Sequence, residues 1–136
     1  MIKPIVRDAF FLSQKSEEAT KADMTIAQDL EDTLKANRDR CVGMAANMIG
    51  YRKKIIIVAT GFADMVMINP VITEKSEPYE TEEGCLSLPG TRKTTRYNRI
   101  TVRYLDKKFE EHTQRFSGYI AQIIQHECDH FTGKLI

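Results

Sequence analysis

Gln125-His126-Glu127-Cys128-Asp129-His130, near the end of the chain, carries a specific chemical pattern. It matches the pattern H-E-x-x-H, in which two histidines one helical turn apart lie on the same face of a helix. Such a pair can bind one metal ion, and Glu127 can take a proton from a water bound to that metal. The motif therefore predicts hydrolytic chemistry, although by itself it also fits two ordinary histidines on a helix.

The residues around this motif predict a helix at the end of the chain. Ser117 is a suitable N-cap. Apolar and aromatic side chains then recur at helical intervals, at Tyr119, Ile120, Ile123, Ile124 and Phe131. The two histidines are thus expected on a helix that packs one face against the core.

A third metal ligand must come from upstream, because a catalytic metal usually has three protein ligands and no His, Asp or Glu follows His130. Cys85 is the best candidate, since a thiolate is a strong ligand and the preceding Gly84 permits unusual backbone geometry. Taken alone, Cys85 would more often be a small buried side chain. Combined with H-E-x-x-H, it is expected to bind the metal.

The composition is that of a globular protein. The 136 residues, 42% hydrophobic and 29% charged, predict one domain over 1–136 and argue against disorder. The net charge of +1 predicts neither direct nucleic-acid binding nor membrane binding. The first residues do not resemble a secretory signal, so we expect a cytoplasmic protein, and three cysteines without an export signal suggest reduced thiols or metal ligands.

The remaining patterns predict an α+β fold with short antiparallel strands packed around the C-terminal metal-binding helix, plus one helix nearer the N-terminus. Helical spacing predicts a helix near 25–38. Apolar runs predict strands at 55–59 and 65–68, joined as a hairpin across Gly61 and closed by Asn69-Pro70. Alternating residues predict a strand over 99–105 with a partner near 109–116.

Three motifs in this order resemble those of peptide deformylases, which carry G-x-G-x-A-A-x-Q, E-G-C-x-S and Q-H-E-x-D-H. The second motif, Glu83-Gly84-Cys85-Leu86-Ser87, and the third, Gln125 to His130, match without a change. The first appears as Cys41-Val42-Gly43-Met44-Ala45-Ala46-Asn47-Met48, with two departures. The resemblance spans most of the chain.

The resemblance implies removal of the N-formyl group from formyl-methionyl nascent peptides, with release of formate. The metal would be Fe²⁺, with Zn²⁺, Ni²⁺ or Co²⁺ as substitutes. Its ligands would be Cys85, His126 and His130. Glu127 would act as general base and then as acid to the leaving amine. The backbone N–H of Leu86 would donate to the developing oxyanion.

Substrate contacts are less well defined by the sequence than the metal site. The resemblance and the helical spacing place them at Val42, Gly43, Met48, Tyr119, Gln122, Ile123 and Arg92. Gly43 would present backbone groups to the peptide, and Arg92 would meet a carboxylate or a carbonyl. Asp129 and Arg96 are expected to pair and steady the helix.

The two departures in the first motif bear on activity. Met48 replaces a glutamine whose amide helps to stabilise the oxyanion, and a thioether cannot donate a hydrogen bond. Gln122 or another group could supply the missing amide. Cys41 replaces the first glycine and restricts the backbone beside the site.

Three functions therefore stay open: an active deformylase, a metal hydrolase acting on another N-acyl peptide or a peptide bond, and a weakly active or non-catalytic deformylase-like protein. The ligand set alone does not identify the metal. Ribosome association is a further possibility for an enzyme of nascent chains. Docking through a C-terminal extension is not expected, since the sequence ends at Ile136.

Overall fold

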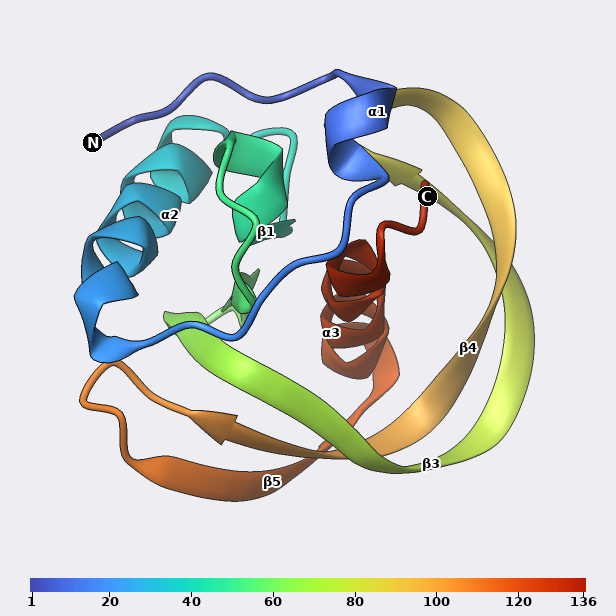
Figure 1. Ribbon diagram of the computed structural model, residues 1–136. Helices are drawn as coiled ribbons and strands as arrows, with labels where there is room; N and C mark the ends of the chain where they lie inside the picture. Colours follow the sequence, from blue (N-terminus) through green and yellow to red (C-terminus); the bar gives the residue numbers. More distant parts are fainter.

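The computed structural model describes residues 1–136 and combines one antiparallel sheet with several helices (Figure 1). The strands are β1 (Gly43–Ala45), β2 (Ile55–Ala59), β3 (Asp64–Cys85), β4 (Leu88–Leu105) and β5 (Glu111–Ser117). The α-helices are α1 (Ala9–Leu12), α2 (Met24–Ala36) and α3 (Gly118–Asp129). Short 3₁₀ helices are η1 (Lys21–Asp23), η2 (Ala46–Ile49) and η3 (His130–Thr132).

The sheet follows chain order, β1-β2-β3-β4-β5, and every strand is antiparallel to its neighbour. β3 and β4 are long and curve around α3, as Figure 1 shows. Three irregularities in the β3–β4 register, at Ile68/Val71, Ile72/Glu74 and Gly84/Cys85, mark β-bulges or similar breaks. Since a bulge bends a strand and increases its twist, these breaks account for the curvature that encloses the helix.

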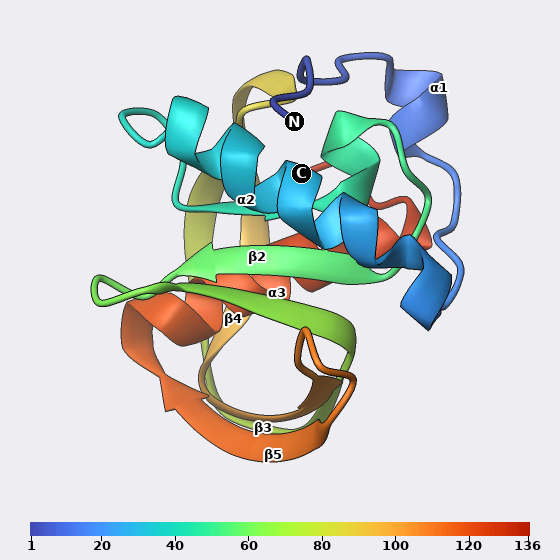
Figure 2. The same ribbon diagram turned by 90° about the vertical axis from the view of Figure 1, so that its left-hand side faces the viewer.

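Strand β2 is buried on both faces, which explains why its sequence is a continuous apolar run. Ile55 and Ile57 belong to the core beneath α2, together with Leu30 and Leu34. The alternate residues of β2 belong to a second core that contains the apolar side of α3. Figure 2 shows α2 and α3 on opposite sides of this strand.

The α+β fold class is confirmed. The predicted helix near 25–38 corresponds to α2, the predicted hairpin across Gly61 joins β2 to β3, and the strand over 99–105 is the end of β4, which pairs with β5. Two strands are much longer than the short ones expected, because β3 has 22 residues and β4 has 18.

The prediction that Asn69-Pro70 closes a strand is wrong. Asn69 takes a positive φ of 50°, which asparagine tolerates better than most residues, and the chain continues as β3 after a register shift. Proline is accommodated because an irregular position does not need its missing N–H. The Asn69 side chain also bonds both backbone groups of Ala19, at 2.7 and 3.0 Å.

Helix α3 begins directly after Ser117, as predicted, although the serine side chain makes no capping hydrogen bond. His126 lies inside the helix, and His130 caps its C-terminal end and opens η3. All three cysteines are free thiols. No helix has the length and apolar character needed to cross a membrane.

Candidate metal centre

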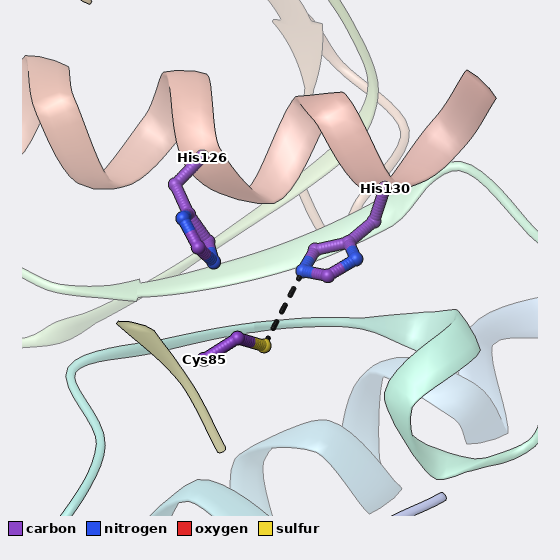
Figure 3. Close-up of side chains that lie close together, drawn as sticks. All are labelled: Cys85, His126 and His130. Atoms are coloured by element: carbon purple, nitrogen blue, oxygen red, sulfur yellow. Dashed lines mark hydrogen bonds between the residues drawn. The ribbon is translucent and has the colours of Figure 1, made fainter. Parts of the chain in front are cut away.

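The end of β3 meets the end of α3 at three side chains whose donor atoms converge. The Cys85 sulfur and the ring nitrogens of His126 and His130 that face it all lie within 4.8 Å of one another. Sγ of Cys85 is 3.6 Å from Nε2 of His130. Figure 3 shows the two rings and the sulfur pointing toward a common space.

The sequence places these groups together through two simple periodicities. On β3, Glu83 and Cys85 are two residues apart and therefore face the same side of the strand. On α3, His126 and His130 are one turn apart. Gly84, which permits unusual backbone geometry, does not have a positive φ, and an added Cβ would lie 3.4 Å from the Gly90 carbonyl across the hairpin. That distance is an ordinary van der Waals contact, so neither φ nor space requires a glycine at this position.

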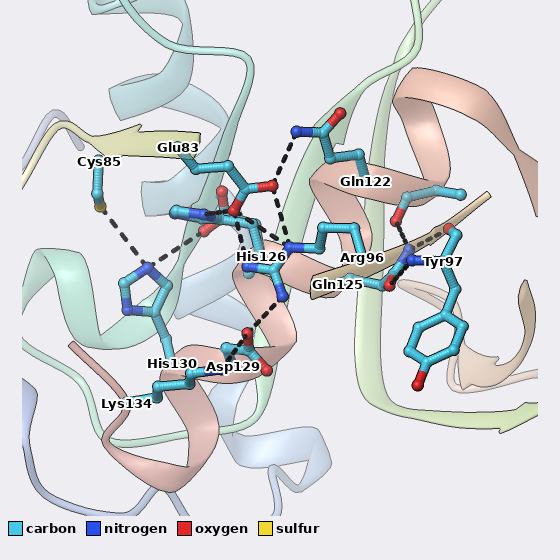
Figure 4. A network of polar contacts seen from close by, with 12 residues as sticks. Glu83, Cys85, Arg96, Tyr97, Gln122, Gln125, His126, Asp129, His130 and Lys134 are labelled. Carbon is cyan, nitrogen blue, oxygen red and sulfur yellow. Dashed lines mark hydrogen bonds and ion pairs between the residues drawn. The ribbon is translucent and has the colours of Figure 1, made fainter. Parts of the chain in front are cut away.

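A buried carboxylate orients His126. Oε1 of Glu83 accepts a hydrogen bond from Nδ1 of His126 at 2.9 Å, which leaves the other ring nitrogen to face Cys85 (Figures 3 and 4). Arg96 donates to the same carboxylate at 2.7 Å and to Asp129 at 2.6 Å. The predicted Arg96–Asp129 pair is confirmed, and Glu83 extends it to the histidine.

The carboxylate of Glu83 is charged in this setting. Burial alone would raise its pKa, but hydrogen bonds from His126, Arg96 and Gln122 outweigh burial and hold the pKa at about 2. The role of Glu83 was missed in the sequence, although its position two residues before Cys85 on a strand was a usable signal.

Glu127 lies beside the three donor atoms. Its Oε1 is buried without a hydrogen-bond partner and lies 3.8 Å from Nε2 of His130. Burial raises the pKa of Glu127 to about 7. One thiol, two imidazoles and an adjacent carboxylate with a free oxygen fit a divalent transition metal with an open position for water.

Strand β1 forms one wall of the site at the edge of the sheet. An added Cβ at Gly43 would lie 2.7 Å from Ile123 and 3.0 Å from Oε2 of Glu127, so only glycine fits there. Gly43 is opposite Val58, while the neighbouring Val42 carbonyl accepts the Ala59 N–H. Because bonded and non-bonded pairs alternate, the backbone groups of Gly43 point to the unpaired edge.

Both departures in the first motif make sulfur contacts with the backbone. The Cys41 thiol donates to the Gly43 carbonyl at 2.8 Å. Met48 is buried, and its sulfur accepts the Ala45 N–H at 3.5 Å. Neither sulfur can replace the amide donor of the family motif.

The amide of Gln122 is already engaged at both ends. Its nitrogen donates to Glu83 at 2.8 Å, and its oxygen accepts from the Tyr79 hydroxyl at 3.3 Å. This arrangement argues against Gln122 as the replacement for the donor that Met48 lacks.

A cavity of about 460 Å³ opens over the site. The expected substrate contacts that line it are Val42, Gly43, Met48, Tyr119, Gln122 and Ile123, together with Leu86. Arg92 does not line it, because its guanidinium reaches the Pro89 carbonyl at 3.5 Å within the hairpin. Arg38 and Arg40, which the sequence did not single out, lie at the cavity instead.

Comparison with known proteins matches residues 2–136 to the polypeptide deformylase family model. A peptide deformylase of Clostridium beijerinckii is 60% identical over the full length of both chains. Peptide deformylase 1 of Clostridium perfringens is 40% identical and covers 81% of this chain and 76% of its own.

Solved structures agree with this match. A class I type b peptide deformylase of Acinetobacter baumannii with Met-Ala-Ser bound superposes with a TM-score of 0.89 at 29% identity, covering 99% of this chain and 97% of the other. A peptide deformylase of Thermotoga maritima gives a TM-score of 0.89 at 30% identity, covering 99% and 95%. The chain belongs to the polypeptide deformylase family.

Proposed function

We propose that this protein removes the formyl group from the N-terminus of formyl-methionyl nascent peptides and releases formate. The observation that carries the proposal is the convergence of Cys85, His126 and His130 within 4.8 Å, beside the buried carboxylate of Glu127. Family membership supports the same reaction. Such peptides emerge from ribosomes in the cytoplasm, where we expect the enzyme to work.

Cys85, His126 and His130 are the proposed ligands of one divalent metal. A metal bound there would polarise the formyl carbonyl and lower the pKa of a bound water. We infer Fe²⁺ as the physiological ion, with Zn²⁺, Ni²⁺ or Co²⁺ as substitutes. Fe²⁺ beside a thiolate is open to oxidation in air. Activity of the iron form should therefore decay in air and persist under anaerobic handling, whereas air-stable activity with zinc alone would contradict iron.

Glu127 is the proposed proton carrier. A carboxylate beside the metal can accept a proton from the attacking water and return it to the leaving amine. Its free Oε1 leaves an acceptor available for that proton. The Leu86 N–H is the proposed donor to the oxyanion, and Arg7, which donates to the Leu86 carbonyl at 2.7 Å, steadies that turn.

The substrate peptide is proposed to lie along the free edge of β1. The backbone of Gly43 points to this edge and can pair with an extended peptide as an added strand does. The methionine side chain would then enter the cavity beside Tyr119, Gln122 and Ile123. The Met-Ala-Ser complex of the Acinetobacter baumannii relative supports a peptide of this kind.

Met48, which lacks the amide donor of the family motif, favours an alternative to full deformylase activity. The protein would then be a hydrolase that acts weakly on formyl peptides or that acts on a different N-acyl substrate. Loss of one oxyanion donor typically costs roughly 10²–10³ in rate. Retention of Glu127 and of all three proposed ligands still supports a working hydrolase.

Formate release from formyl-Met-Ala-Ser by protein purified without oxygen tests the proposal, with acetyl-Met-Ala-Ser as the matched substrate. Formate release that far exceeds acetate release is expected. Faster acetate release would instead identify another N-acyl peptide as the substrate, and no release of either acid would indicate a non-catalytic protein.

A further inference from the structure

Gln122 belongs to the hydrogen-bond network that holds His126 (Figure 4). Its side chain lines the cavity, and its amide nitrogen donates to Oε2 of Glu83 at 2.8 Å. One helical turn further along α3, Nδ1 of His126 bonds Oε1 of the same carboxylate at 2.9 Å. A single buried carboxylate therefore connects the cavity wall to a proposed metal ligand.

Glu83 and Tyr79 hold the two ends of the Gln122 amide. The carboxylate of Glu83 only accepts, so the amide nitrogen faces it, and the tyrosine hydroxyl donates to the amide oxygen at 3.3 Å. An amide turned by 180° would place its carbonyl oxygen against a carboxylate oxygen and lose the hydrogen bond. Glu83 thus fixes the direction of the contact, and the Tyr79 hydroxyl holds the amide in place.

Arg96 also donates to both carboxylate oxygens of Glu83. Each of these oxygens accepts a further hydrogen bond from a residue of α3. Nη2 of Arg96 donates to Oε1 at 2.7 Å, and Nε lies 3.0 Å from Oε2. Oε1 therefore shares Arg96 with His126, and Oε2 shares it with Gln122. Without the Gln122 amide, Oε2 would have no partner on α3, and the carboxylate could turn toward Arg96 and away from His126.

We propose that Gln122 is a positioning residue that links the substrate side-chain cavity to the orientation of the His126 ring, with Tyr79 holding its amide in place. Gln122 acts through Glu83 and touches none of the reacting atoms. That the cavity receives a substrate side chain rests on the proposed function. Its effect on the metal site does not depend on any substrate.

Gln122→Met and Tyr79→Phe test the proposal, because the first removes the amide at similar length and the second removes only its hydroxyl partner. Gln28→Met is the matched control: Gln28 is an exposed helical glutamine that donates to the Asp32 carboxylate at 3.0 Å, far from the cavity lining. The readouts are the Co²⁺ dissociation constant, by competition with a chelator, and the absorption spectrum of the Co²⁺-loaded protein.

Removing an outer partner of a metal ligand typically weakens metal binding 10- to 100-fold. Gln122 bonds Glu83 and not the metal ligand itself, so Gln122→Met should weaken Co²⁺ binding by about tenfold, the low end of the 10- to 100-fold range. The absorption spectrum of the Co²⁺-loaded protein should also shift. Tyr79→Phe should act in the same direction by about two- to threefold, and Gln28→Met should match wild type. kcat on formyl-Met-Ala-Ser should fall with the metal affinity.

A residue that only lines the cavity would raise KM and leave the Co²⁺ affinity and spectrum at wild-type values, and that result would overturn the proposal. If Gln122→Met does not fold, Tyr79→Phe decides, and wild-type Co²⁺ binding in that variant overturns the proposal equally. Failure of the proposed function is distinguishable, because wild type would then release no formate while the Co²⁺ measurements would still differ between variants.

Discussion

The two halves of the site differ in the strength of their hydrogen bonds. On the side of β3 and α3, Glu83 is only 8% exposed and receives bonds from three side chains. On the side of β1 and η2, Cys41 and Met48 contact the backbone through sulfur. Sulfur is a weak hydrogen-bonding atom. The half proposed to hold the metal thus keeps the family motifs, whereas the half proposed to face the substrate departs from them at Cys41 and Met48.

The largest expected effect is the loss of metal binding when a proposed ligand is removed. Cys85→Ala, His126→Ala and His130→Ala should each weaken metal binding by more than roughly 100-fold, the upper end of what loss of an outer partner costs. Metal content after dialysis measures the effect. Cys128→Ala is the control, since Cys128 lies within the His126–His130 motif but is not among the converging donors. Full metal occupancy in Cys85→Ala would remove that thiol from the site.

A smaller effect is expected from restoring an amide donor on the side of β1 and η2. Met48→Gln restores an amide donor and should raise kcat on formyl-Met peptides by up to roughly 10²-fold, because the donor acts where charge develops. Met48→Leu, which adds no donor, is the control. Steady-state kinetics decide, and an unchanged kcat in Met48→Gln would show that the site has already been repacked around another donor.

Protonation of His126 should set the pH dependence of metal binding. Burial lowers the pKa of His126, but hydrogen bonds with Cys85 and Glu83 outweigh it and raise the pKa to about 10 in the metal-free protein. A protonated imidazole cannot bind a metal, so binding at neutral pH must release a proton. Metal affinity should therefore rise by up to about tenfold per pH unit between pH 6 and 9. A pH-independent dissociation constant would contradict this.

The smallest effect concerns the Cys41 thiol. Cys41→Ala frees the Gly43 carbonyl, and a typical net hydrogen bond of about 0.5–1 kcal/mol corresponds to a KM about two- to fivefold lower. kcat should change little, because the contact is made in the ground state. Cys128→Ala again serves as the control, and a change confined to kcat would place Cys41 in the chemistry.

The sequence predicts the local features of this molecule better than the long-range ones. Periodicity is sufficient for α2, for the hairpin across Gly61 and for the histidines on α3. The continuation of β3 past Asn69-Pro70 depends on a bulge and on contacts with Ala19, which are far away in the chain. No local pattern reports such contacts.

The same distinction holds for the candidate site. The three donors were identified because their spacing and chemistry are distinctive. Arg92 was expected at the substrate and instead bonds within its own hairpin. The role of Glu83 depends on the pairing of β3 with β4, which brings Arg96 to it, and on α3 packing across the sheet. Such partners become visible only in three dimensions.

Glu127→Gln provides the most direct test of the central claim, that one metal held by Cys85, His126 and His130 works with Glu127 as the base. Metal content and formate release from formyl-Met-Ala-Ser are measured on the same preparation. We expect one metal per chain, as in wild type, with formate release reduced by roughly 10²–10⁴, the usual value of a general base. Loss of the metal, or formate release at the wild-type rate, would contradict it.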